Sequence, residues 1–211
     1  MAKIDLVTIA RQFGAGGSDL ALELSKVLGW AVLDREIIHD AAERLHADEA
    51  RAANVDEYVT GVLQKLAKGF ALGVPEYAIE PAYEVDPDEV ARATHQVILG
   101  AVKSVPLIVV GHGVQCLLKS RPSTLHVRMV APVAKRAACV AERLQLELAE
   151  ATAEVQRRDG QRARYLRHHF GCDNNDPMLY DVQFNTAQLS VAEVAGAIAQ
   201  LVNARPSSSS V

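Results

Sequence analysis

A glycine-rich turn near the amino terminus is the part of this sequence best suited to binding an anion. Gly14, Gly16 and Gly17 follow an apolar segment at residues 4–9. Glycine allows backbone conformations in which N–H groups turn toward a bound oxyanion. Ser18 then begins a helix whose positive dipole end faces the same point. The spacing predicts a strand, a phosphate-binding turn and a helix.

The turn differs from the common nucleotide-binding loop, whose pattern is G-x-x-x-x-G-K-[ST]. In the eight residues that start at Arg11, the pattern is matched by Gly16 and Ser18. Arg11 replaces the first glycine, and Gly17 replaces the lysine that brings charge to the β- and γ-phosphates. Arg11 is the nearest cation that could do this work. The alternative is a plain glycine-rich turn; a dinucleotide-binding G-x-G-x-x-G pattern fails at Asp19.

A second group of cations lies between residues 156 and 170, where five arginines accompany one acid, Asp159. The arginines are Arg157, Arg158, Arg162, Arg164 and Arg167. Arg158 and Arg162 are one helical turn apart, so they share a helix face. Arginine binds phosphate oxygens with a planar fork and stays charged at any working pH. The cluster is either a lid over a phosphate site or a solvated helix face.

Polar groups also follow two other predicted strands. Asp34 and Arg35 come at the end of residues 30–34, and His112 lies between two glycines after residues 106–110. Asp34 either caps the next helix or contacts a ligand. His112 is either a buried histidine with a satisfied hydrogen bond or a partly charged site residue. Both positions fall at the carboxyl ends of strands, where ligands bind to parallel sheets.

Strand and helix patterns alternate along the chain. Apolar segments predict strands at residues 4–9, 30–34, 106–110, 124–132 and 178–186, with 106–110 in the centre of the sheet. Helical spacing predicts helices at residues 18–28, 132–148 and 190–202, and others between residues 37 and 102. The alternation predicts an α/β fold of three layers, α/β/α, with a central parallel sheet.

Composition limits the classes of protein and partner. The chain has 211 residues, 49% of them hydrophobic, and contains no apolar run long enough to span a bilayer. A net charge of −4 argues against binding a nucleic acid polymer. MAKIDLV does not read as a signal sequence, so we expect a soluble, cytoplasmic protein with no membrane partner. The sequence does not decide whether the protein forms a homodimer.

Cysteines and histidines give weaker signals. Cys116, Cys139 and Cys172 lack the spacing of a disulfide framework or a zinc site, so free thiols are expected. His168 and His169 are adjacent and diverge on a helix, and no further ligand is placed near them. We therefore do not expect a metal there.

Two further pairs of side chains have competing interpretations. Arg136 and Arg143 are seven residues apart on a predicted helix, and we expect their shared face to be solvated. Tyr165 and Phe170 either stack on a nucleotide base or pack beneath the predicted lid.

Five blocks, in this order, resemble the cytidylate kinase-like family, a branch of the P-loop nucleoside monophosphate kinases. They are TIARQFGAGGSDLA, LDREII, VVGHG, LHVRMVAP and RRDGQRARYLRHHFGCDNNDPMLYDVQFNT. The lysine-less loop is similar to that branch's own, whereas Gly111-His112-Gly113 departs from its usual Gly-Arg-Gly. The resemblance implies one P-loop kinase-like domain with a core (1–34, 105–148, 178–204), a helical insertion that receives the monophosphate (about 35–104), an arginine-rich lid (about 149–177) and a disordered tail (205–211).

The resemblance also implies roles for individual residues. The phosphates of ATP would be surrounded by Gly14, Ala15, Gly16, Gly17 and Ser18, with the Ser18 hydroxyl on Mg²⁺. The acceptor, CMP or dCMP, would be contacted by Asp34, Arg35, His112 and Asp159. The catalytic cations would be Arg11, Arg158 and Arg162. The alternative on the same fold is a nucleotide-binding sensor or partner-binding module without turnover, because Val110 also stands where an aspartate often binds magnesium.

Overall fold

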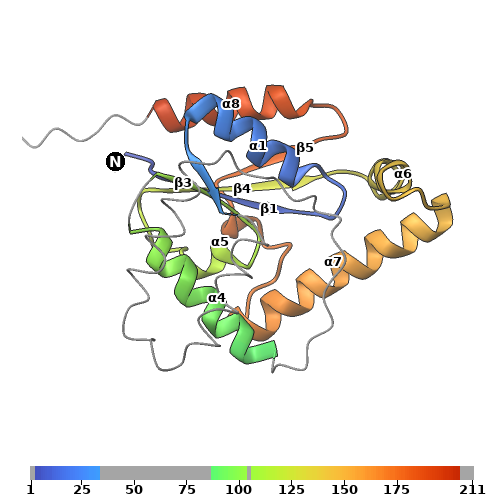
Figure 1. Ribbon diagram of the computed structural model, residues 1–211, viewed down its shortest axis with the longest axis horizontal. Helices are drawn as coiled ribbons and strands as arrows, with labels where there is room; N and C mark the ends of the chain where they lie inside the picture. The colour runs from blue at the N-terminus through green and yellow to red at the C-terminus, as the bar shows by residue number, and fades with distance from the viewer. Residues whose placement is uncertain (1–2, 34–86, 104–105, 205–211) are drawn as a thin grey trace, which may run out of the picture.

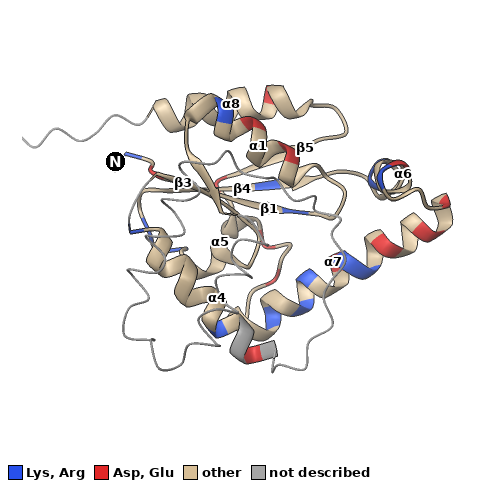
Figure 2. Ribbon diagram, viewed as in Figure 1, with Lys and Arg blue, Asp and Glu red and all other residues tan. Residues whose placement is uncertain are grey.

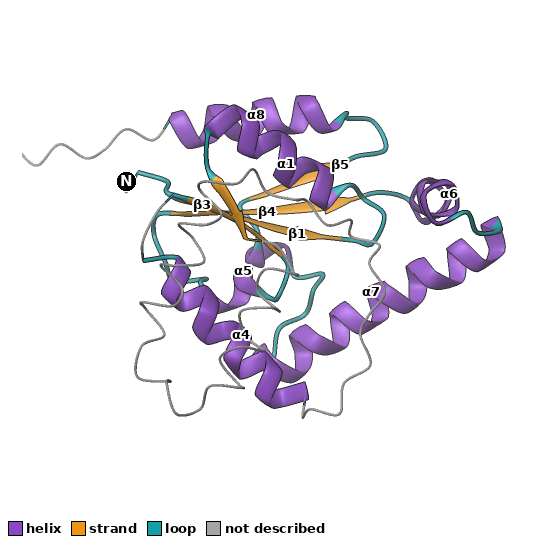
Figure 3. Ribbon diagram, viewed as in Figure 1, coloured by secondary structure: helices purple, strands orange, loops and turns teal. Residues whose placement is uncertain are grey.

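The apolar segments predicted as strands form one parallel sheet (Figure 3). The computed structural model describes residues 3–33, 87–103 and 106–204. Within them the sheet order is β2-β3-β1-β4-β5. The strands are β1 (Leu6–Arg11), β2 (Ala31–Leu33), β3 (Leu107–Val110), β4 (Thr124–Val130) and β5 (Val182–Asn185). The central strand is β1 and not the predicted 106–110 segment, which lies between β1 and β2.

Helices cover both faces of this sheet, as the alternating pattern predicts (Figure 1). On one face lie α1 (Gly17–Leu28) and α8 (Val191–Asn203), and on the other lie α4 (Pro87–Ala101) and α5 (Val114–Leu117). The fold is therefore a three-layer α/β/α structure. Asp34, Arg35, the predicted helices between residues 37 and 70, and the predicted tail lie outside the described residues.

The core is divided by the sheet because side chains alternate along each strand. Val7 and Ile9 on β1 belong to the cluster packed against α1 and α8, whereas Leu6 belongs to the cluster beside α4 and α5. All three side chains are buried. Buried strands of this kind are nearly continuous in apolar residues, which is why β1 and β3 are recognisable in the sequence.

The predicted helix at residues 132–148 is in fact two helices. The first, α6 (Val133–Leu144), ends where Gln145 adopts a left-handed conformation with φ of 54°. The second, α7 (Leu148–Phe170), begins with a capping box between Glu147 and Glu150. The chain therefore turns a corner that apolar periodicity alone does not reveal, because both helices carry apolar residues at helical spacing.

Helix α7 is the longest helix among the described residues. It runs from α6, beyond the carboxyl ends of the strands, to the start of α4 (Figure 1). Glu150 and Glu154 come first along α7, and the arginines follow from Arg157 onward (Figure 2). A separate apolar cluster of Phe13 with Ala137, Val140, Ala151 and Val155 joins α6, α7 and the turn after β1. The arginines are thus carried on a helix that packs against the predicted phosphate loop.

No helix in the described ranges of the chain has the length and apolar character needed to cross a membrane.

Candidate active site

The glycine-rich turn connects β1 to α1, as predicted. Gly14 and Gly16 have φ of 79° and 82°, in the left-handed region that favours glycine. A Cβ atom on Gly14 would also lie 2.9 Å from Val140 Cγ2 and 3.0 Å from the Arg136 carbonyl oxygen. Gly16 is the N-cap of α1 and has no side chain to bond the N–H groups of the first turn. Those groups are the ones that bind an anion at a helix start.

Ala15 and Ser18 occupy different parts of this turn. Ala15 is buried in the core, and its carbonyl oxygen accepts a hydrogen bond from Thr186 Oγ1 at 3.1 Å. Ser18 is partly exposed in the first turn of α1. Of the two, Ser18 is placed to offer a side-chain oxygen, whereas Ala15 offers backbone alone.

The Arg11 side chain crosses the position that a P-loop lysine would need. A Cβ atom on Gly17 would lie 2.7 Å from Arg11 Cγ and 3.1 Å from Arg11 Cδ. Farther along the same side chain, Arg11 Nη1 lies against Gly111, so closely that a Cβ atom there would overlap it. Arg11 therefore reaches from the end of β1, over the start of α1, to the turn after β3. A lysine at position 17 and Arg11 in this conformation exclude each other.

Arg158 and Arg162 face the phosphate loop from α7. Their guanidinium carbons lie 5.3 Å and 5.6 Å from the centre of the Phe13 ring, within cation–π distance. Arg162 Nη1 also donates a hydrogen bond to the Arg11 carbonyl oxygen at 3.0 Å. The two arginines share one helix face, as their spacing predicts, and the structure brings both to the loop that contains Arg11.

Asp159 fixes α7 to the loop. Its Oδ1 accepts a hydrogen bond from the Phe13 backbone N–H at 2.8 Å, and its Oδ2 pairs with Arg136 Nη1 at 2.7 Å. Arg136 donates in addition to the Phe13 and Ala131 carbonyl oxygens, at 3.0 Å and 2.8 Å. This Arg136–Asp159 pair holds the loop backbone at Phe13 from both sides. The role of Asp159 toward an acceptor stays a prediction.

The expectation that Arg136 is solvated is wrong. Its side chain is 3% exposed, because it lies between α6, the loop and α7. Arg143, on the same helix, is exposed as expected and pairs with Asp19 at the start of α1. The sequence signal for Arg136 is Val140, a buried residue one turn later on the same face, which places Arg136 on the packed side of α6.

The turn after β3 has a strained backbone. Gly111, His112 and Gly113 have φ of 83°, 54° and 68°, so three successive residues are left-handed. For His112 this conformation is uncommon, and such outliers gather at functional sites. Because Arg11 reaches Gly111, its side chain links this turn to the glycine-rich loop at the carboxyl ends of β1 and β3. His112 therefore follows the carboxyl end of β3, and its role toward an acceptor stays a prediction.

Tyr165 and Phe170 pack between α7 and α4. The Phe170 ring lies so close to Gly113 that a Cβ atom there would overlap it, and the ring centroid is 4.9 Å from that of His95. The Tyr165 hydroxyl is 3.2 Å from His95 Nε2, and burial raises the pKa of Tyr165 to about 12. These contacts agree with packing beneath α7, one of the two interpretations of this pair.

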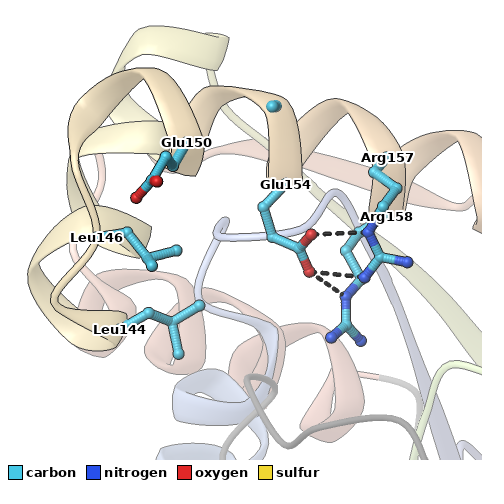
Figure 4. A pocket seen from close by; sticks show the side chains of 7 residues that line it. Leu144, Leu146, Glu150, Glu154, Arg157 and Arg158 are labelled. Atoms are coloured by element: carbon cyan, nitrogen blue, oxygen red, sulfur yellow. Dashed lines mark hydrogen bonds and ion pairs between the residues drawn. The ribbon is translucent and has the colours of Figure 1, made fainter.

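An open pocket of about 520 Å³ lies beside the site, at the corner between α6 and α7 (Figure 4). Glu154 is at its centre, and hydrogen bonds from Arg157, together with those from Arg158, lower the Glu154 pKa to about 2. The pocket wall is completed by Leu144, Leu146, Glu150 and Ala153. With its carboxylates and leucines, this pocket is poorly suited to phosphate. Arg158 connects it to the site through Phe13.

The fold is a three-layer α/β structure whose first strand ends in a glycine-rich loop. Residues 6–188 match the cytidylate kinase-like family, and the chain belongs to that family. Among curated proteins, none matches this chain in sequence. The family and the fold support a nucleotide kinase as the kind of enzyme.

Solved structures agree on the fold at low sequence identity. An uncharacterized protein from Eubacterium ventriosum superimposes with a TM-score of 0.71 and 15% identity, over 96% of this chain and 100% of that one. A shikimate kinase from Bacteroides thetaiotaomicron has a TM-score of 0.50 and 12% identity, over 97% and 100%. A gluconokinase from Sinorhizobium meliloti has a TM-score of 0.50 and 13% identity, over 97% of each chain.

Proposed function

We propose that this protein transfers the γ-phosphoryl group of ATP to a nucleoside monophosphate, CMP or dCMP, and releases the diphosphate and ADP. The observation that carries the proposal is the course of Arg11, whose side chain covers Gly17 and extends to Gly111. The aliphatic part of Arg11 thus passes over the position where the P-loop pattern has lysine, and its permanently charged guanidinium group lies at the turn after β3. Membership of the cytidylate kinase-like family supports the nucleotide as acceptor class.

The donor would lie along the turn from Gly14 to Ser18. The first-turn N–H groups of α1 fit an anionic phosphate, because the N-cap is a glycine and has no side chain to bond them. The Ser18 hydroxyl fits a Mg²⁺ ligand, as an oxygen donor in the position that the P-loop serine or threonine takes. Bound Mg²⁺ would neutralise charge on the β- and γ-phosphates.

Phosphoryl transfer depends on positioning and charge stabilisation more than on a catalytic base. An acceptor phosphate oxygen is already a nucleophile, and the negative charge of the transferring group must be stabilised in the transition state. The cations proposed for this work are Arg11 at the end of β1 and Arg162 on α7, and Arg162 Nη1 donates a hydrogen bond to the Arg11 carbonyl oxygen. Arg158 stands one turn earlier on the same face. Asp34, Arg35, His112 and Asp159 are the proposed acceptor contacts.

A coupled assay tests the proposal: purified protein, ATP and Mg²⁺ are mixed with CMP, dCMP, UMP, AMP and GMP in turn, and with shikimate and gluconate. We expect diphosphate formation with a pyrimidine monophosphate as the best acceptor. Turnover of shikimate or gluconate instead would overturn the assignment of the acceptor.

A pair of variants on α7 makes the assay specific. Arg162→Ala should lower kcat by about 100-fold to 1,000-fold, the usual effect of removing one charge-stabilising donor. Arg157→Ala is the matched control, because the Arg157 side chain is 47% exposed and its guanidinium pairs with Glu154. Its kcat should stay within about twofold of the natural protein. Equal losses in the two variants would argue against a role for Arg162 at the reacting phosphate.

The alternative is a nucleotide-binding module without turnover. Val110 at the end of β3 and His112 in place of arginine favour it, because each removes a charged group from the site. Tight ATP binding with no diphosphate from any monophosphate would establish this alternative.

A further inference from the structure

Two helices that are far apart in the sequence bring three metal-ligating side chains together away from the phosphate loop. His168 and His169 lie near the end of α7, and Asp88 lies in the first turn of α4. One ligand atom from each lies within 4.8 Å of the others. Asp88 Oδ1 is 3.0 Å from His168 Nε2 and 3.9 Å from His169 Nδ1. The start of α4 and the end of α7 meet in Figure 1.

These distances fit a tetrahedral ion. With zinc–ligand bonds of about 2.0–2.1 Å, neighbouring ligand atoms lie about 3.3 Å apart. The two distances from Asp88 bracket that value and the histidine ligand atoms lie within 4.8 Å of each other, so side-chain rotations would bring the three atoms to a common centre. Two imidazole nitrogens and one carboxylate oxygen are ligands that Zn²⁺ accepts, whereas Mg²⁺ and Ca²⁺ prefer oxygen alone.

The three side chains differ in how firmly they are held. His169 is 15% exposed, and its ring packs on Tyr165 with 4.4 Å between centroids. His168 and Asp88 are 66% and 53% exposed, so an ion can reach them from solvent. One ligand is thus fixed by packing and two can adjust, with a hydrogen bond already joining the adjustable pair. The sequence does not suggest this site, because Asp88 is 80 positions from His168.

We propose that Asp88, His168 and His169 bind a Zn²⁺ ion, with the fourth position open to water or a ligand. The ion would join the start of α4 to the end of α7, the helix that carries Arg158 and Arg162. This site is separate from the proposed Mg²⁺ position at Ser18, and it does not depend on the kinase reaction.

Zinc titration of tag-free protein against a chromophoric chelator tests the proposal, and the visible spectrum of the Co²⁺-loaded protein reports coordination. We expect one ion per chain, a tetrahedral Co²⁺ spectrum and a higher melting temperature with Zn²⁺, since the ion binds the folded chain. Asp88→Asn and His168→Ala should each weaken zinc binding by about tenfold or more, as losing a ligand costs at least what losing an outer-shell partner does. Both residues are exposed, so neither change should unfold the protein.

Two control variants keep the test specific. Asp173→Asn removes another exposed carboxylate, and Cys172→Ser removes the nearby thiol. Both controls should bind Zn²⁺ like the natural protein. The proposal is overturned if the protein takes up no Zn²⁺, if Asp88→Asn and His168→Ala bind it unchanged, or if Cys172→Ser loses it while Asp88→Asn retains it.

Discussion

The Arg136–Asp159 ion pair should contribute more to the free energy of unfolding than an exposed ion pair on a helix. We consider Asp159→Asn, which keeps the size of the side chain and an oxygen that can accept from the Phe13 N–H, but removes the charge opposite Arg136. The Arg136 side chain is 3% exposed and the Asp159 side chain 26%. Breaking a fully buried ion pair from one side costs about 3–5 kcal/mol. Because water reaches a quarter of Asp159, we expect about 2 kcal/mol.

That loss is measurable by thermal or urea unfolding. For a chain of this length, 1 kcal/mol corresponds to about 2–4 °C in Tm, so Asp159→Asn should melt about 4–8 °C lower. Arg136→Met should cost about 3–5 kcal/mol, since it also removes the donors to the Phe13 and Ala131 carbonyl oxygens. The double variant should lose less than the sum by about 1–2 kcal/mol, because the two side chains interact directly.

The Arg143–Asp19 pair is the matched control. It involves the same helix, α6, but both side chains are exposed, at 45% and 37%. Asp19→Asn and Arg143→Met should each change stability by less than about 1 kcal/mol, with coupling near zero. The reasoning is refuted if Asp159→Asn is no less stable than Asp19→Asn, or if the coupling of the two pairs is the same.

Two further predictions concern the rest of α7. The Glu154 pKa is lowered from its ordinary 4.5 to about 2, mainly by hydrogen bonds from Arg157. Glu154 therefore stabilises the fold above pH 4.5, and this stabilisation is lost as the pH falls toward 2. Because the Glu154 side chain is 21% exposed, Glu154→Gln should lower the free energy of unfolding by about 1 kcal/mol at pH 7. Urea unfolding should show the same stability for the variant and the natural protein near pH 2. A stability difference that stays constant between these pH values would count against the pair. Gly113→Ala combines a left-handed backbone with overlap of Phe170, so its Tm should drop by more than that of Gly29→Ala, where φ is similar and no atom of the described residues lies within 4 Å. Equal drops would mean that the Phe170 contact is loose.

Local signals explain which parts of the molecule the sequence predicts. The strands before the glycine turn and before Gly111 are continuous apolar segments, and Ser190 forms its capping box with Glu193 as expected. The two arginines at 158 and 162 are likewise placed correctly on one face by helical spacing. Each of these features depends on residues close together in the chain.

Features that depend on distant residues are the ones that sequence reasoning misses. Arg136 is buried because it lies between α6, α7 and the loop, and the Phe13 carbonyl that accepts its hydrogen bond is 123 positions away. The corner at Gln145 results from one left-handed residue inside an otherwise helical pattern. The path of Arg11 over Gly17 is set by how α1 leaves β1, and the sequence offers Arg11 as the nearest cation without giving its direction.

The central claim, that Arg11 takes the place of the missing lysine, is tested most directly by exchanging the two positions. The kcat of Arg11→Ala, Gly17→Lys and the double variant Arg11→Ala/Gly17→Lys should be compared with that of the natural protein, with folding checked by thermal melting. We predict that each single variant loses about 100-fold or more in kcat, since one lacks the cation and the other forces a clash with Arg11 Cγ. The double variant should recover at least about tenfold over Arg11→Ala, because lysine then supplies the charge. An unchanged kcat in Arg11→Ala, or a double variant no better than it, would contradict the account.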